Sequence, residues 1–430
     1  MKNSKKRHVL SHYIFARGLE YWKVLQGAAF ALLLGLGAAS SCLADTPQSF
    51  NANTVLPANL LSGPHHTVAP RTENDGRFNH YVLKTEYGSF RVRSTDLLRL
   101  RIRELDALAK MNKVRIPAFY LKAAGGSALA PANGAIRFVK NPGKGVRDAK
   151  ARVREALGNI RLPFSGQSDG HKPDGLVSRL SGFSEAKRDV AARFGVDPYS
   201  TFQPLQTRLA VLARARMSGK LTTQVGYSFV TGPASIAISV GEGMHTLTEK
   251  IRDKSVGELH RENRAALLAM RVEPAVVNAF LANPKLSPTD KTIIVAAMKS
   301  LDGTHDRGVF VKYASRVKRA DDAFAVRRRA EFTASYHSQV WPVRAFVQVG
   351  DQPAAKINDR RLAVIVPADY LTWTQATAQT VQGMNVARKK LSPRPSVTLV
   401  LAGSADRKSV KQLRKIGWQV KQNVRPSPAQ

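Results

Sequence analysis

The sequence predicts a helix-rich α+β protein, and three of its features lead to that prediction. Residues 80–94 alternate apolar and polar side chains on both sides of Tyr87-Gly88-Ser89, which predicts an N-terminal β-hairpin. Several segments between 94 and 340 carry apolar residues at helical spacing. Residues 341–422 alternate strand-like and helix-like stretches, which predicts a small C-terminal α/β unit with a β-α-β-α-β run and right-handed crossovers.

Length and composition are those of a folded protein with a strong excess of positive charge. The chain has 430 residues, 43% of them hydrophobic and 23% charged, and it can bury sizeable cores. It carries 67 Lys and Arg against 31 Asp and Glu, a net charge of +36. Beyond residue 44 there are still 61 basic and 30 acidic side chains, so the excess belongs to the body. Such a chain attracts anionic partners.

Residues 1–44 have the layout of an export signal or an anchor. A basic stretch precedes 21 uncharged residues, 24–44, which end in small side chains. We expect cleavage after Ala44 and a location in the periplasm or cell envelope. An uncleaved membrane anchor and lipid attachment at Cys42 are the alternatives. Since Cys42 is the only cysteine, disulfides and Cys-ligated metal are excluded from the body.

The body is expected to consist of four segments. Residues 45–76 are rich in Pro, Asn, Thr and Ser, which predicts a flexible spacer whose two adjacent histidines are not metal ligands. A mainly helical domain follows over 77–340, then the α/β unit over 341–422 and a tail over 423–430.

The elements follow from local patterns. A helix over 95–111 is expected after the hairpin, with Ser94 or Thr95 as its N-cap. The uncharged run 221–241 is interrupted by Gly-Pro and rich in Ser and Thr, so it is interpreted as buried loop and short core elements rather than as a membrane span. The remaining predicted elements are helices over 184–194, near 206–219 and across 246–340, strands over 343–349, 361–367, 396–403 and 418–424, and helices over 369–384 and 404–417.

The segment 137–161, RFVKNPGKGVRDAKARVREALGNIR, combines an apolar helical stripe with a basic row. Such a helix can lie in the headgroup region of a membrane, or it can be an ordinary surface helix of a basic protein. Its Gly-Lys-Gly is no P-loop, because no Ser or Thr follows the lysine. The cations assigned to anion or membrane contact are Arg137, Lys140, Lys144, Arg147, Lys150 and Arg154.

Two groups of residues are candidates for catalysis. Ser404 and Asp406 follow one apolar strand and Asp369 follows another, and ligands of open α/β sheets bind beyond the carboxyl ends of strands. The alternative is that Asp369 and Ser404 are N-caps of the helices that follow. Glu242 and His245 lie together in a Gly-rich turn and could share acid–base work. No metal site and no cofactor is predicted, since H-E-x-x-H is absent and no group of three or four ligands converges. The nucleophile motif G-x-S-x-G is absent as well.

The sequence contains several basic patches, which bear on the kind of partner that the protein binds. Aromatic residues make up only 7% and do not interleave the patches, and no zinc-finger, RRM or KH signature occurs, so nucleic acid is not expected as a partner of an exported chain. Besides 137–161, the patches are 91–103, 208–220, 316–329 and 407–415.

The blocks NHYVLKTEYGSFRVRSTDLLRLRIREL, FGVDPYSTFQPLQTRL and PADYLTWT resemble a family of exported bacterial proteins of unknown function. That resemblance implies export and a folded body, and it implies no activity and no catalytic residue.

Together these observations predict a non-catalytic exported protein that associates electrostatically with anionic lipid or polysaccharide of the cell envelope. One alternative is an envelope enzyme with a crevice near Asp369 and Ser404. The other is a nucleic-acid-binding protein, which requires that the chain is not exported.

Overall fold

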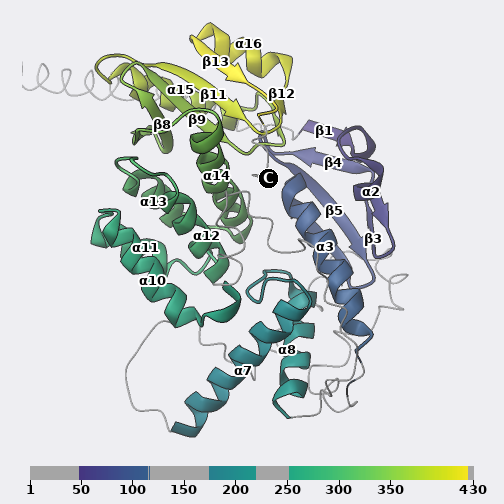
Figure 1. Cartoon of the computed structure of the whole chain (residues 1–430). Coiled ribbons are helices and arrows are strands. Elements are labelled where there is room, and N and C mark those ends of the chain that lie inside the picture. Colours follow the sequence, from purple (N-terminus) through teal and green to yellow (C-terminus); the bar gives the residue numbers. More distant parts are fainter. Residues whose placement is uncertain (1–47, 115, 117–173, 219–250, 425–430) are drawn as a thin grey trace, which may run out of the picture. The chain divides into compact units, whose positions relative to one another are not determined.

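The structure, a computed structural model, describes residues 48–114, 116, 174–218 and 251–424. Contacts divide the chain into the units Met1–Thr46 and Pro47–Gln430, and all described residues belong to the second. This unit is a helix-rich mixture of helices and sheets (Figure 1), as the sequence predicts.

The first sheet is antiparallel and is built around β5 (Asn79–Thr85). One edge of β5 pairs with β6 (Gly88–Arg93), which confirms the predicted hairpin. The other edge pairs with β4 (Arg71–Asn74) and β3 (His66–Val68). The sheet is completed by β1 (Gln48–Asn51) beside β4 and β2 (Ser62–Gly63) beside β3, and two short helices, η1 (Ala52–Thr54) and α2 (Ala58–Leu61), lie between β1 and β2.

The prediction of a flexible spacer over 45–76 is therefore wrong for its described part. The segment was interpreted as a spacer because it is rich in polar residues, but some of these polar side chains are buried in the sheet. Asn74 is fully buried, and its side-chain amide donates to the side-chain oxygen of Asn79 (2.8 Å) and to the carbonyl of Tyr370 (3.0 Å). Buried polar groups that find such partners cost little to bury, so a strand can consist of polar residues.

Three helices complete the N-terminal core. Ser94 caps α3 (Thr95–Asn112), since its hydroxyl accepts from the N–H of Leu97 (3.2 Å), which confirms one of the two predicted caps. The apolar stripe of α3 packs with α7 (Asp174–Arg193), α8 (Gln203–Met217) and the sheet around Tyr81, Leu83 and Leu205.

A second helical group follows, and its core continues into the C-terminal sheet. Residues such as Phe280, Phe310 and Ala330 share one core with Phe346 and Val400 of the C-terminal strands. The predicted domain boundary at residue 340 thus falls inside a continuous core. The helices are α10 (Val256–Ala269), α11 (Pro274–Ala282), α12 (Pro288–Lys299), α13 (Gly308–Ser315) and α14 (Ala320–Gln339).

The second sheet has the order β13 (Trp418–Lys421), β11 (Ser396–Leu401), β9 (Arg361–Val366), β8 (Gln352–Asn358) and β7 (Ala345–Val349). Its strands β9, β11 and β13 are parallel neighbours, and β8 and β7 continue the sheet antiparallel. Two-residue strands β10 (Tyr370–Leu371) and β12 (Ser404–Ala405) pair separately.

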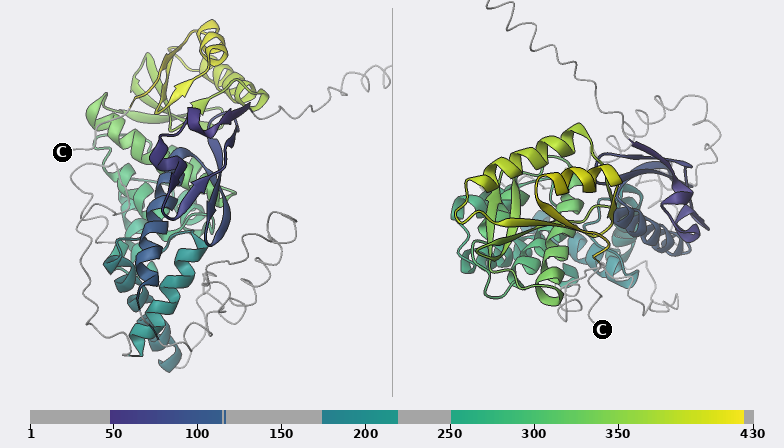
Figure 2. Two further views of the ribbon diagram at one scale, coloured as in Figure 1. Left: turned by 90° about the vertical axis from the view of Figure 1, so that its right-hand side faces the viewer. Right: turned by 90° about the horizontal axis from the view of Figure 1, so that it is seen from above.

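The two faces of this sheet have different cover. One face packs on α14 and the helical core. The other carries α15 (Gln375–Lys389) and α16 (Arg407–Lys415), whose Met384 and Leu413 share a third core with Val364 and Leu399. Figure 2 shows α15 and α16 lying across this outer face.

Candidate functional site

Asp369 does not cap its own helix, because α15 begins only at Gln375 with Thr374 as its cap. Its carboxylate instead accepts from the backbone N–H of Asn79 (3.0 Å) and of Thr95 (3.0 Å). Thr95 is the first residue of α3, and negative charge is favourable at the N-terminus of a helix. Asp369 therefore joins the C-terminal unit to the first sheet and to α3, and the prediction that it is an N-cap of the following helix is wrong.

Burial raises the pKa of Asp369 to about 7, and the negative charge of Asp96 acts in the same direction. The donors Asn79 and Thr95 lower the pKa, but they do not offset burial. A carboxyl group that titrates near neutrality therefore connects these elements.

Asp369→Asn is expected to remove a pH dependence of stability. The folded pKa of about 7 lies above the ordinary 3.8, so the folded state holds this proton more tightly. This contribution is fully present below about pH 4 and is lost as the pH rises through about 7. Wild type should thus be more stable relative to the variant at pH 5 than at pH 8 in urea unfolding. A constant difference across that range would contradict the role of Asp369.

Ser404 and Asp406 have positions different from those expected. Ser404 lies in β12 rather than at a helix cap, and its N–H lies 3.4 Å from the carbonyl of Asp369. Asp406 is the cap of α16: it accepts from the N–H of Ser409 (2.5 Å) and of Trp373 (3.3 Å). The N-cap of α16 is therefore Asp406, two residues after the predicted cap Ser404. The carboxylate of Asp369 lies at the N-terminus of α3 and that of Asp406 at the N-terminus of α16.

The other candidates lie outside the described residues. These are Glu242, His245 and the basic residues Arg137, Lys140, Lys144, Arg147, Lys150 and Arg154. Among the described ranges, no three His, Cys, Asp or Glu side chains are grouped so that they could hold a metal ion.

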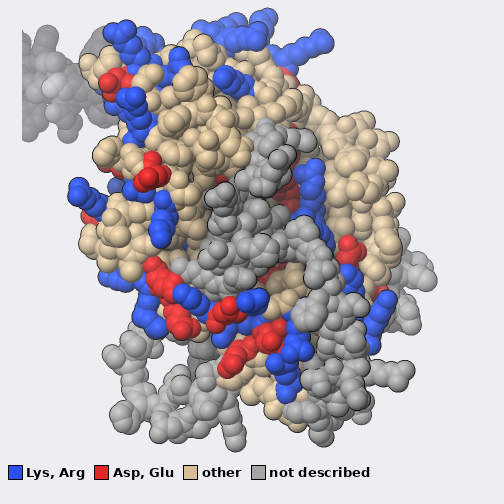
Figure 3. Space-filling model, viewed as in Figure 1, with Lys and Arg blue, Asp and Glu red and all other residues tan. Residues whose placement is uncertain are grey.

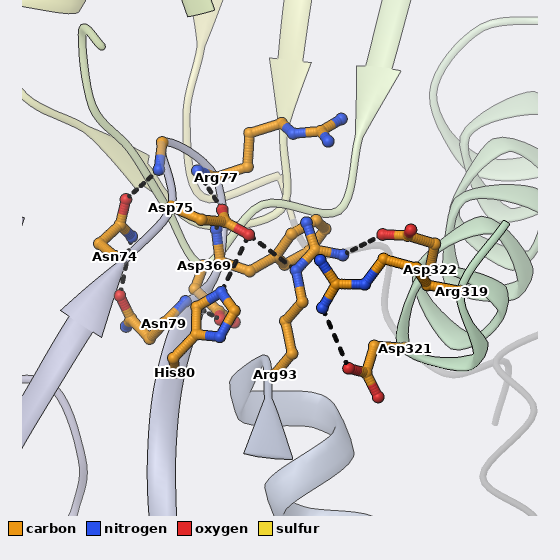
Figure 4. A network of polar contacts seen from close by, with 12 residues as sticks. Asn74, Asp75, Arg77, Asn79, His80, Arg93, Arg319, Asp321, Asp322 and Asp369 are labelled. Atoms are coloured by element: carbon orange, nitrogen blue, oxygen red, sulfur yellow. Dashed lines mark hydrogen bonds and ion pairs between the residues drawn. The ribbon is translucent and has the colours of Figure 1, made fainter. Parts of the chain in front are cut away.

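A polar network lies beside Asp369 (Figure 4). Asp75 accepts from Arg93 (2.7 Å) and contacts the His80 ring (3.0 Å), and Arg93 also binds Asp322 of α14 (2.8 Å). Burial would raise the pKa of Asp75, but the His80 hydrogen bond and the Arg93 charge outweigh it and hold the pKa well below its usual range. Arg93 is thus neutralised internally.

Next to this network lies a cavity of about 420 Å³, which we call the basic cavity. Segments of the first sheet, of α13 and α14, and of the loops around β8 and β9 contribute to its wall. Asp369, Ser404 and Asp406 do not line it. Its charged lining residues are Arg77, Arg93, Arg316, Lys318, Arg329, Asp322 and Asp351.

Most of the basic patches predicted from sequence are partly turned inward. Arg101 in the patch 91–103 binds Glu104, and Arg208 in the patch 208–220 is buried and donates to the carbonyl of Met111 (2.7 Å). In the patch 316–329, Arg327 and Arg328 form ion pairs with buried acids. These cations are unavailable to a partner.

The patch 407–415 differs, because every one of its cations is exposed and none has an acidic partner among the described residues. The end of α15 lies close by, since the Arg388 side chain donates to the carbonyl of Pro395 (3.2 Å) and contacts that of Ile416 (3.5 Å). Figure 3 shows Lys and Arg gathered over this part of the molecule. The C-terminal basic face comprises Lys389, Lys390, Arg394, Arg407, Lys408, Lys411, Arg414 and Lys415.

In residues 375–424 there are ten Lys and Arg against Asp406 alone, and Asp406 is engaged as a cap. A run of cations of this kind can be recognised from the sequence alone. The basic cavity cannot be recognised in this way, because its cations come from segments that are far apart in the chain.

Comparison with known proteins gives no match to any family model, curated protein or solved structure. Within the described residues, no helix has the length and apolar character needed to cross a membrane.

Proposed function

We propose that this protein is a non-catalytic, exported binding protein that associates with anionic lipid of the cell envelope through its C-terminal basic face. The observation that carries the proposal is a contrast between the described patches: each of the others has cations that are buried or paired with acids, whereas all the cations of α16 are exposed and none is paired with an acid among the described residues. Acidic polysaccharide is a second anionic partner of the same kind. Export, with cleavage after Ala44, is part of the proposal and is supported by the sequence pattern of residues 1–44.

The topology supports this concentration of charge. The order of β9, α15, β11, α16 and β13 supports interpreting residues 361–421 as a β-α-β-α-β unit, interrupted by β10 and β12. Right-handed crossovers place consecutive helices on the same face of a sheet. The cations of α15 and α16 therefore share the outer face.

Physically, each Lys or Arg held near an anionic membrane contributes about 1 kcal/mol, and the effect falls off within a Debye length of roughly 8–10 Å. Eight exposed cations on one face are thus enough for binding at low salt that weakens as salt is added.

The test is sedimentation of the mature protein with vesicles of phosphatidylglycerol and phosphatidylcholine or of phosphatidylcholine alone, over a salt series. We expect binding to the anionic vesicles only. Changing Lys408, Lys411, Arg414 and Lys415 to Gln should weaken it a hundredfold or more, from about 1 kcal/mol per cation.

A matched control removes the same charge from exposed positions of the first sheet and α3. It changes Lys84, Arg91, Lys110 and Lys113 to Gln, again three lysines and one arginine. Vesicle binding should change much less. Equal losses in the two variants would mean that only net charge matters, and equal binding to both vesicle types would refute the proposal.

The enzyme alternative has less support, since the carboxylate of Asp369 is engaged by Asn79 and Thr95 and the basic cavity is not lined by Ser404. Nucleic-acid binding is tested by adding duplex DNA to the same salt series. Duplex DNA that binds the chain more tightly than anionic vesicles at equal salt would favour it.

A further inference from the structure

We propose that the basic cavity is a binding site for a small organic phosphate, a ligand distinct from the membrane surface contacted by the C-terminal basic face. The inference rests on the side chains that line the cavity, and in particular on one buried arginine.

Arg329 of α14 is buried, with 4% of its surface exposed, and no acidic side chain pairs with it among the described residues. Its guanidinium donates to the Gln352 side-chain oxygen (2.8 Å) and the Pro353 carbonyl (2.9 Å), and it stacks on the Tyr313 ring at 5.0 Å. These neutral partners fix its orientation and leave its charge uncompensated. A buried charge without a counter-ion is costly, so an anion in the cavity would stabilise this arrangement.

Other cations at the wall strengthen the site. Arg77, Arg316 and Lys318 are exposed, line the same cavity and have no acidic partner in the part of the chain that the structure describes. In Figure 4 the Arg77 guanidinium points away from the Asp75 network. Burial lowers the pKa of Arg329, Tyr313 raises it in part, and the charge of Arg77 lowers it, so the two cations are close enough to repel each other.

The charge balance favours a doubly charged anion. Among the acids of the wall, Asp322 is paired with Arg93, which leaves Asp351 against four cations. A phosphate group offers several acceptor oxygens to the forked donors of arginine, and such charge-assisted hydrogen bonds are about twice as strong as neutral ones.

The size and the apolar part of the wall indicate an organic body on the phosphate. A volume of about 420 Å³ is typical of small-molecule sites and far exceeds the needs of a bare ion. Phe78, Val326, Val366 and Pro367 supply apolar surface beside the cations. The ligand class is thus a phosphate monoester with a partly apolar body, either a free metabolite-like ester or a lipid headgroup.

Calorimetric titration of the full chain at constant ionic strength tests the proposal. The probes are inorganic phosphate, phenyl phosphate and a short-chain, water-soluble phosphatidic acid. We expect phenyl phosphate to bind more tightly than inorganic phosphate. Tighter binding of the phosphatidic acid would indicate a lipid headgroup, and tighter binding of phenyl phosphate a free ester.

Arg329→Met removes the buried charge and keeps an unbranched apolar stem, and Arg77→Gln changes an exposed residue. Loss of a charged hydrogen-bond partner should weaken phenyl phosphate binding roughly tenfold to a hundredfold. The exposed position of Arg77 keeps the test valid if Arg329→Met fails to fold, as judged by circular dichroism.

Arg414→Gln on the C-terminal basic face is the control and should bind phenyl phosphate as wild type does. Conversely, Arg77→Gln should leave vesicle binding nearly unchanged, so the two proposals can fail separately. No saturable binding of any probe, or the same affinity in Arg77→Gln as in wild type, would overturn the inference.

Discussion

Gly403→Ala is expected to lower the free energy of unfolding by about 3 kcal/mol. Gly403 connects β11 to β12 and passes directly against the segment that carries Asp369. An added Cβ would lie 2.0 Å from the carbonyl oxygen of Asp369 and 2.6 Å from that of Ala368. These are backbone atoms, which cannot turn aside as the end of a flexible side chain can.

The damage should extend beyond the clash. Gly403 donates to the Ala368 carbonyl (3.0 Å) and accepts from the N–H of Asn423 (2.8 Å). Moving it would separate the β10–β12 pair and shift Asp369, whose carboxylate joins β5 and α3. Only glycine permits so close an approach of two backbones.

Gly383→Ala is the matched control, since the same change within α15 meets no atom within 4 Å. Alanine is the better helix former, so the variant should be more stable by about 0.5–1 kcal/mol. Both variants are compared by urea unfolding at pH 7. Similar midpoints for the two would show that the backbones at Gly403 are not tightly packed.

Glu331→Gln should also destabilise the protein by about 3 kcal/mol, because it removes one charge from a buried ion-pair network. Glu331 is fully buried in α14. Its carboxylate forms ion pairs with Arg327 (3.4 Å) and Arg328 (2.5 Å). Arg327 also pairs with Asp290 of α12 (3.7 Å), and Arg328 also pairs with Asp96 of α3 (3.0 Å).

The acidic side chains of this network offset the cost of burying its arginines. Burial by itself would lower the pKa of Arg328, but Glu331 and Asp96 raise it above the ordinary value. With glutamine in place of Glu331, two largely buried guanidinium groups lose a shared counter-ion, and the helices α3, α12 and α14 lose a common point of attachment.

Glu73→Gln provides the control, because Glu73 is half-exposed and pairs with Arg71 at 3.8 Å on the surface. Such pairs contribute about 0–1 kcal/mol, so its unfolding midpoint should stay near that of wild type. If Glu331→Gln were no more destabilising than Glu73→Gln, the buried network would not hold the helices together.

Local patterns predicted several elements correctly. The alternation around Gly88 predicted the β5–β6 hairpin, and Ser94 with the apolar spacing after it predicted α3. Both depend on interactions within a few residues. The strands over 343–349 and 361–367 likewise correspond to β7 and β9, because short apolar runs bounded by turns are typical of buried strands.

The interpretation of Asp369 as an N-cap is wrong because its partners are far away in the chain. Asp369 looked like the cap of the next helix, but the backbone of Asn79, 290 residues away, supplies one of its donors. In the polar strand β4, the buried amide of Asn74 is satisfied partly by the nearby Asn79 and partly by Tyr370, which is 296 residues away. The cavity is assembled from segments as distant as Arg77 and Arg329.

The sequence by itself determined the sign and amount of charge, the helix-rich α+β character and the elements whose hydrogen bonds and apolar stripes are local. Only the tertiary structure decided which cations are neutralised inside and which remain exposed. Arg328 meets Asp96 across 232 residues and Arg93 meets Asp322 across 229, whereas the cations of α16 meet no described acid. The physical reason is that a helix or hairpin forms through near neighbours, while the electrostatic environment of a side chain depends on every segment packed around it.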